Sequence, residues 1–222
     1  MNRYEGDRVR VALPGGELQT KVINKLQQRG VKLDSANNKK YLIQATNIPV
    51  DLVVVRASAV PELVNCERSH LQGGITGSDI LWEAGLGPNA GEELPIDAGS
   101  TVFVGVTGRL RRNVGSPVTI DDLAGSMVVT KFPNITEEVF AERGIPIEVF
   151  AAAGKTEAMQ YVYPNCNGIV DVISSGSTAR ANDLTVVESI LPVTVRLINT
   201  NEQLTEREQD ILADFRDRMI KT

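Results

Sequence analysis

The sequence predicts an α/β protein made of two lobes with a cleft between them. Segments rich in Val and Ile alternate with helical patterns almost to the end of the chain, as in folds with largely parallel sheets. A stretch dense in Gly and Pro, GLGPNAGEELPIDAGS (85–100), is expected to cross between the lobes. The strand-rich segment 184–200 is expected to return to the first lobe. We therefore expect residues 1–98 with 180–222 to form lobe I, and residues 99–179 to form lobe II.

Seven strands are predicted from short apolar runs bounded by turn residues. Their ranges are 8–13, 51–57, 73–77, 101–107, 127–130, 145–151 and 168–173. Helices fall between them. The segments Glu17–Arg29 and 134–143 each carry one apolar face, and each ends before a glycine, Gly30 or Gly144. A capping-box pattern at Thr205 opens a C-terminal helix. Ligands are expected where the carboxyl ends of strands face the cleft.

Composition excludes several classes of protein. The chain has 222 residues, is 42% hydrophobic and carries a net charge of -5 without a basic stripe, which argues against a nucleic-acid surface. The start MNRYEGDRVR is charged, and no stretch of eighteen apolar residues exists, so we expect a cytoplasmic protein without a membrane span. Two cysteines, Cys66 and Cys166, and one histidine, His70, provide neither a disulfide framework nor a zinc site.

The stretch IVDVISSGSTARAN (169–182) is the clearest candidate site. A predicted strand carrying Asp171 leads directly into the five residues 174–178, which are Ser-Ser-Gly-Ser-Thr. Small residues let the backbone close around a compact ligand, and their N–H groups and hydroxyls can donate several hydrogen bonds to a phosphate. Asp171 is placed to accept hydrogen bonds from vicinal hydroxyls such as those of a ribose. The alternative is a solvated turn whose hydroxyls cap a helix.

The segment GIVDVISSGSTARANDL (168–184) resembles the phosphoribosyl pyrophosphate loop of the ATP phosphoribosyltransferase family. Other segments resemble the same family in the same order, so that the resemblance covers residues 8 to 200. These segments are VALPGGEL (11–18), NIPVDLVVVRASAVPELV (47–64), GGITGSDIL (73–81), LAGSMVVTKFPNI (123–135) and GKTEA (154–158).

The resemblance implies two lobes of the type II periplasmic-binding-protein kind, with the active site between them. It also implies a reaction in which N1 of the adenine of ATP attacks C1 of phosphoribosyl pyrophosphate and pyrophosphate leaves. This is the first step of histidine biosynthesis. The chain resembles the short form of the family, whose catalytic subunit works with a regulatory subunit like a histidyl-tRNA synthetase, and a homodimer or larger oligomer is expected. Mg²⁺ is expected to arrive on the pyrophosphate, with no protein metal ligands.

The same resemblance assigns roles to individual residues. The 5′-phosphate would lie against Ser174, Ser175, Gly176, Ser177 and Thr178, the ribose hydroxyls against Asp171, and the opening loop, with Gly15 and Gly16, would also contact the phosphoribosyl donor. Arg56 would face the pyrophosphate, and Lys40 would add a second positive charge. The nucleotide would contact Thr130, Lys131, Phe132, Pro133 and Glu157. The alternatives are a surface salt bridge for Arg56, a solvated pair for Lys40, a strand end for 130–133 and a helix cap for Glu157.

The opening loop departs from the family pattern. Where the family usually has Pro-Lys-Gly-Arg, this chain has Pro14-Gly15-Gly16-Glu17, so two positive charges are replaced by one negative charge. Three alternatives therefore stay open. The chain is a divergent paralogue that uses ATP or another nitrogen nucleophile in a specialised nucleoside pathway, a two-lobe protein that binds a small anion without catalysis, or a degenerate regulatory subunit.

Overall fold

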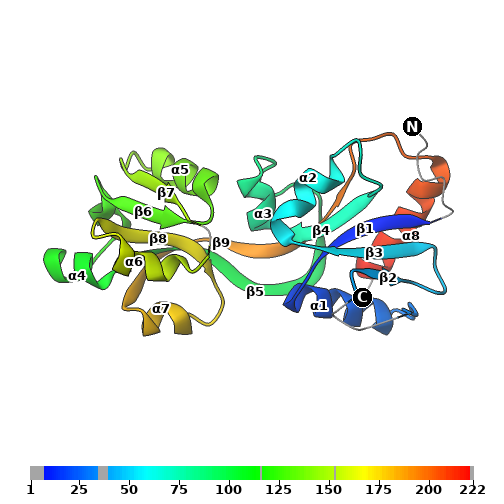
Figure 1. Ribbon diagram of the computed structural model, residues 1–222, viewed down its shortest axis with the longest axis horizontal. Coiled ribbons are helices and arrows are strands. Elements are labelled where there is room, and N and C mark those ends of the chain that lie inside the picture. Colours follow the sequence, from blue (N-terminus) through cyan, green and yellow to red (C-terminus); the bar gives the residue numbers. More distant parts are fainter. Residues whose placement is uncertain (1–7, 35–39, 116, 153, 221–222) are drawn as a thin grey trace. The chain divides into compact units, whose positions relative to one another are not determined.

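The computed structural model describes residues 8–34, 40–115, 117–152 and 154–220 (Figure 1). The chain forms two compact units. Unit 1 comprises residues 1–98 and 194–222, and unit 2 comprises residues 99–193. Residues 180–193 lie in unit 2, whereas the sequence pattern predicts them in lobe I. Leu184 is the physical reason, because it is buried in the apolar core of unit 2 with Val129 and Ile169.

The sheet of unit 1 is mostly parallel at its centre. Its strands are β1 (Val9–Pro14), β2 (Leu42–Gln44), β3 (Val50–Val55), β4 (Gly73–Gly77) and the last part of β9 (Leu184–Asn199). The order is β2-β3-β1-β4-β9, with β1 parallel to β3 and β4 and with β2 and β9 antiparallel to their neighbours. The carboxyl ends of β1 and β3 therefore meet at one edge, where Pro14 pairs with Val55.

Helices cover both faces of this sheet (Figure 1). The helices α1 (Glu17–Gln28) and α8 (Glu206–Ile220) share one core, in which Val22 and Leu26 pack with Phe215 and with Val11 and Leu13 of β1. On the other face lie η1 (Ala57–Ala59), α2 (Val60–Val64) and α3 (Ser78–Glu83). Alternating side chains of β1 point to the two cores, as the period of a strand requires.

The sheet of unit 2 is formed by β5 (Glu92–Thr107), β8 (Cys166–Ile173), β6 (Met127–Thr130) and β7 (Glu148–Ala151), in that order. The strands β8, β6 and β7 are mutually parallel, and β5 is antiparallel to β8. The strand β5 begins at Glu92, inside the Gly- and Pro-rich stretch, so the connection between the units is itself largely a strand. The second connection is β9, which begins in unit 2 and ends in unit 1.

Short helices follow the strands of unit 2. They are α4 (Gly108–Val114), η2 (Ile120–Leu123), α5 (Pro133–Glu142), η3 (Thr156–Ala158), α6 (Met159–Val162) and α7 (Ser177–Ala181). Figure 1 shows α5 on one side of the sheet and α6 and α7 on the other. Every helix in the described ranges is too short or too polar to span a lipid bilayer.

Candidate active site

Lys131 and Asp171 meet at the carboxyl edge of the unit 2 sheet. The parallel register of β6 and β8 pairs Thr130, the last residue of β6, with Val170, so Lys131, which follows β6, comes near Asp171 of β8. Lys131 Nζ lies 2.9 Å from Asp171 Oδ2. Asp171 is only 5% exposed, whereas the Lys131 side chain is 40% exposed. The pair joins a residue predicted to bind nucleotide to one predicted to bind ribose.

The carboxylate of Asp171 has two further donors. The hydroxyl of Thr156, a fully buried residue of η3, donates to the same oxygen, Oδ2. The backbone N–H of Val172 donates to the other oxygen, Oδ1, at 2.7 Å. Burying a carboxylate is costly unless it is paired and hydrogen-bonded, and these three donors meet that requirement. A carboxylate has about four lone-pair positions, and one on Oδ1 accepts from no described residue.

The predicted phosphate loop follows β8 directly. Gly176 has φ 69°, a left-handed conformation that glycine adopts without a steric penalty, and it is the N-cap of α7. The hydroxyl oxygens of Ser175 and Ser177 lie 3.0 Å apart. Arg180 folds back from α7, and its Nη2 donates to the carbonyl oxygen of Ser175 at 3.1 Å. The loop is therefore held in a tight turn with its hydroxyls exposed.

The loop lines a small pocket of about 110 Å³ together with Phe103 and Glu157. No described residue accepts a hydrogen bond from the N–H groups of Gly176 and Thr178. The pocket wall thus has unused backbone donors and several hydroxyls, which is the donor set that a phosphate group requires. Glu157 is grouped here with the loop, although the sequence assigns it to the nucleotide.

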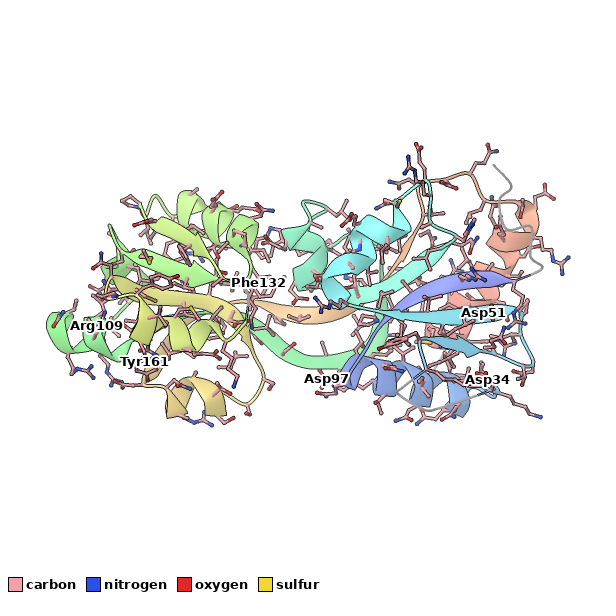
Figure 2. The ribbon with its side chains drawn as sticks, viewed as in Figure 1. Asp34, Asp51, Asp97, Arg109, Phe132 and Tyr161 are labelled. Carbon is pink, nitrogen blue, oxygen red and sulfur yellow. The ribbon has the colours of Figure 1, made fainter. Side chains whose placement is uncertain are left out.

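The segment 130–133 forms the turn between β6 and α5. Thr130 is fully buried, and its hydroxyl oxygen accepts from the Phe132 N–H at 2.8 Å and lies 3.1 Å from the hydroxyl of Thr136. Phe132, which Figure 2 labels, is 7% exposed, and Pro133 begins α5. Thr130, Phe132 and Pro133 therefore shape this turn. Lys131 is the only one of the four residues 130–133 whose side chain carries a charge.

In unit 1, the carboxyl edge of the sheet brings together Gly15, Gly16 and Arg56. The N–H of Gly15 donates to the carbonyl oxygen of Val55 at 3.1 Å, so the glycine loop lies beside the residue that precedes Arg56. Gly16 has φ 89° and is the N-cap of α1, which has no side-chain capping hydrogen bond. Arg56 is exposed, and no carboxylate in the described part of the chain pairs with it. The surface salt bridge considered for Arg56 is therefore absent from the described residues.

Lys40 has a partner of its own. Its Nζ lies 3.0 Å from Asp34 Oδ2, and the Lys40 side chain is 51% exposed. The other oxygen of Asp34 accepts from the N–H of Gln44 at 2.9 Å, which fixes this carboxylate beside β2. Figure 2 labels Asp34 in unit 1. An exposed pair of this kind contributes little stability, but it partly neutralises the charge of Lys40.

Two residues of the unit 2 site are not identified by sequence reasoning. Thr156 lies in the quoted GKTEA segment, where only the acidic Glu157 draws attention, and Arg180 follows the loop without a recognisable pattern. Their roles depend on which atoms the fold brings near Asp171 and Ser175, and a linear pattern does not encode those distances. Cys166 is buried, and burial raises the pKa of its thiol to about 11.

A metal ion has no ready-made site in the described residues. No group of three or more His, Cys, Asp or Glu side chains there is arranged to hold one. Three donors already occupy Asp171. These residues fit a Mg²⁺ ion only if phosphate oxygens and water molecules provide most of the ligands of the ion.

Solved structures with the same fold define the class of protein. The chain is similar to a periplasmic sulfonate-binding protein from Methylobacillus flagellatus, with a TM-score of 0.56, 13% identity, and coverage of 95% of this chain and 67% of the other. It is also similar to an ATP phosphoribosyl transferase (HisG:HisZ) complex from Thermotoga maritima, with a TM-score of 0.71, 20% identity, and coverage of 95% and 98%. The predicted two-lobe α/β class of the type II periplasmic-binding-protein kind is therefore confirmed.

Sequence relatives identify the family. The family model described as HisG: ATP phosphoribosyltransferase matches residues 56–220. The chain is 32% identical to the ATP phosphoribosyltransferase of Methanopyrus kandleri over 90% of this chain and 68% of that protein. It is 31% identical to that of Syntrophotalea carbinolica over 95% of this chain and 94% of that protein. The chain therefore belongs to the ATP phosphoribosyltransferase family, the transferases of the first step of histidine biosynthesis.

Proposed function

We propose that this protein joins N1 of the adenine of ATP to C1 of phosphoribosyl pyrophosphate, and that unit 2 holds the ribose 5-phosphate part of the donor. The observation that carries the proposal is the buried carboxylate of Asp171, held by Lys131 and Thr156 immediately before the hydroxyl-rich loop 174–178. Family membership supports the reaction, and this arrangement supports the assignment of residues.

The phosphate of the donor is assigned to the loop. Unused N–H groups at Gly176 and Thr178 and the exposed hydroxyls of Ser174, Ser175 and Ser177 would donate to its oxygens. The free lone pair on Asp171 Oδ1 would accept a hydrogen bond from one ribose hydroxyl. In this assignment the sugar lies next to the phosphate, as their covalent connection demands.

The chemical step requires little covalent help from the protein. The attacking N1 is neutral, and pyrophosphate is a good leaving group, so alignment of the reactants and stabilisation of charge on the leaving group are the main needs. We assign the leaving pyrophosphate to Arg56, whose planar guanidinium matches phosphate oxygens and has no described carboxylate partner. Gly16 would contribute its backbone N–H group beside it, and Gly15, whose own N–H donates to Val55, would hold the loop at the end of β3. Lys40 is a supplementary charge, because Asp34 already pairs with it.

Mg²⁺, when bound to the pyrophosphate, supplies charge neutralisation of the leaving group. The nucleotide is assigned to the turn at 130–133 and to Glu157. In that assignment Lys131 contributes the charged side chain, and Thr130, Phe132 and Pro133 hold the turn.

A regulatory partner is also proposed. The similar Thermotoga maritima structure is described as a HisG:HisZ complex, and this chain covers 98% of the matched chain. We infer a partner of the same kind, a subunit resembling a histidyl-tRNA synthetase, and an oligomeric catalytic subunit.

The test is release of pyrophosphate on mixing the protein with ATP, phosphoribosyl pyrophosphate and Mg²⁺, with and without such a subunit. We expect release to depend on both substrates. Because the opening loop carries Glu17 in place of a positive charge, other nitrogen bases are compared with ATP in the same assay. No release with any base, even in the presence of the regulatory subunit, would refute the proposed reaction.

A further inference from the structure

We propose that Thr156 is a positioning residue for the phosphoribosyl donor: its hydroxyl fixes the carboxylate of Asp171 so that Oδ1 remains available to a ribose hydroxyl. The inference rests on the proposed role of Asp171. It assigns a task to a side chain that neither the sequence pattern nor the family membership singles out.

The contacts at Asp171 divide between its two oxygens. Within the described ranges, Oδ2 accepts from both Thr156 and Lys131, and Oδ1 accepts only from the N–H of Val172. A carboxylate rotates easily about its last bond, because that torsion has broad, roughly two-fold preferences. Because Thr156 and Lys131 both donate to Oδ2 and Val172 donates to Oδ1, the three donors fix the rotation of the carboxylate about this bond. The unfilled lone pair is thereby confined to Oδ1.

Thr156 is the stiffer of the two side-chain donors. It is fully buried, and a β-branched side chain has few χ1 rotamers. Lys131 reaches Oδ2 through a long stem that is 40% exposed, and holding such a chain in one geometry costs conformational entropy. Lys131 therefore provides the positive charge beside Asp171, whereas Thr156 fixes the orientation of the Asp171 carboxylate.

The turn that carries Thr156 is anchored independently of its hydroxyl. The side-chain amide of Gln160 donates to the carbonyl oxygen of Glu157 at 3.0 Å and to that of Asn182 at 2.8 Å. The N–H of Ala158 also bonds to the carbonyl oxygen of Lys155 at 3.1 Å. Removing only the Thr156 hydroxyl should therefore leave η3 in place next to the loop.

The experiment compares Thr156→Val, which has nearly the same shape without the hydroxyl, with Thr156→Ser, which keeps it. We expect Thr156→Val to raise the KM for phosphoribosyl pyrophosphate by about tenfold, the effect of one hydrogen bond to a charged group. The KM for ATP should stay within about twofold, and Thr156→Ser should restore most of the affinity for the donor.

Thr107→Val is the matched control. Thr107 is another fully buried threonine of unit 2, and its hydroxyl oxygen accepts from the N–H of Leu110 at the start of α4. This variant should lower the melting temperature but leave the KM for the donor unchanged. A purely structural role of Thr156 would instead raise both KM values together or change neither, and either result overturns the inference.

Asp171→Asn separates this inference from the proposed function. If Asp171→Asn weakens donor binding and folded Thr156→Val behaves as the wild type, then the positioning role is wrong while the assignment of the site stands. If Asp171→Asn binds the donor normally, the assignment of the site itself is wrong. Thr156→Ala provides the same comparison with donor binding as readout, should Thr156→Val not fold.

Discussion

Lys131 Nζ lies 2.9 Å from Asp171 Oδ2: Lys131 directly follows β6, Asp171 lies in the neighbouring parallel strand β8, and each comes one position after the paired Thr130 and Val170. The sheet register therefore creates the pair, and the loop 174–178 follows it within a few residues. The charge of Lys131 offsets the cost of burying Asp171, so the carboxylate can remain available at the carboxyl edge of β8.

Removing Lys131 should destabilise the protein as well as weaken donor binding. Lys131→Met leaves the buried carboxylate of Asp171 with one fewer donor, and we expect a loss of roughly 1–3 kcal/mol in the free energy of unfolding. Urea titration measures this loss. The double variant with Asp171→Asn should recover much of the stability, because no buried charge is then left unpaired. Additive losses in the double variant would show that the two groups do not interact.

Replacing Arg56 should act on turnover and not on folding. Arg56→Ala removes an exposed guanidinium with no described partner, so the melting temperature should hardly change. We expect kcat/KM for phosphoribosyl pyrophosphate to fall by about 10- to 100-fold, the range for hydrogen bonds to a charged group. Arg56→Lys should recover only part, because a lysine cannot form the bidentate fork. Arg68→Ala, at another exposed arginine of unit 1, is the control and should be active.

The conformation of Gly176 can be tested with a glycine of similar geometry. Gly176→Ala forces alanine into φ 69°, which costs about 1–2 kcal/mol, and should raise the KM for the donor. Gly85→Ala forces alanine into φ 76° in unit 1, where an added methyl group meets no atom within 4 Å. A methyl group added at Gly176 lies 3.0 Å from Arg180 Nη1 and 3.3 Å from Ile173 Cδ1, so Gly176→Ala should lose at least as much stability as Gly85→Ala. Only Gly176→Ala should lose affinity for the donor. Equal KM values for the donor in the two variants would show that the loop 174–178 does not bind the donor.

Asp183 should contribute to acid stability. A hydrogen bond from Arg112 and the nearby charge of Arg111 hold the pKa of its carboxyl below its usual value. As the pH falls, the Asp183 carboxylate is therefore protonated first in the unfolded chain, at about pH 4. The stability that Asp183 gains from Arg111 and Arg112 is present above that pH and is lost as the pH falls below it. We expect Asp183→Asn to flatten the change in urea midpoint between about pH 5 and pH 3. Asparagine is chosen because it tolerates the positive φ of this position, 54°. An unchanged pH profile would contradict the assignment.

Much of the fold is predictable from local pattern. Apolar runs bounded by turn residues correspond to β1, β3, β4, β6 and β8, and the apolar faces ending at Gly30 and Gly144 correspond to α1 and α5. The helix α4 is not predicted, because GRLRRNV has few apolar residues and depends on the Thr107 cap. The start of β5 at Glu92 is not predicted either, because the Gly and Pro residues of the stretch 85–100 favour a loop.

The candidate site is only partly predictable. Asp171 and the Ser-Gly loop can be recognised because they are contiguous in the sequence and end an apolar strand. The contacts of Thr156 and Lys131 with Asp171 cannot, because they depend on the register between β6 and β8 and on the turn after β7. Arg56 is also only partly predictable from the sequence. Its sequence context suggests a charge at a strand end, whereas the lack of a described carboxylate partner is visible only in three dimensions.

The most direct test is equilibrium binding of phosphoribosyl pyrophosphate with Mg²⁺, measured by titration calorimetry on the wild type, Asp171→Asn and the control Arg68→Ala. We predict that the wild type and Arg68→Ala bind the donor alike and that Asp171→Asn binds at least about tenfold more weakly. Equal binding by all three proteins would contradict the assignment of the sugar phosphate to the end of β8 and its loop.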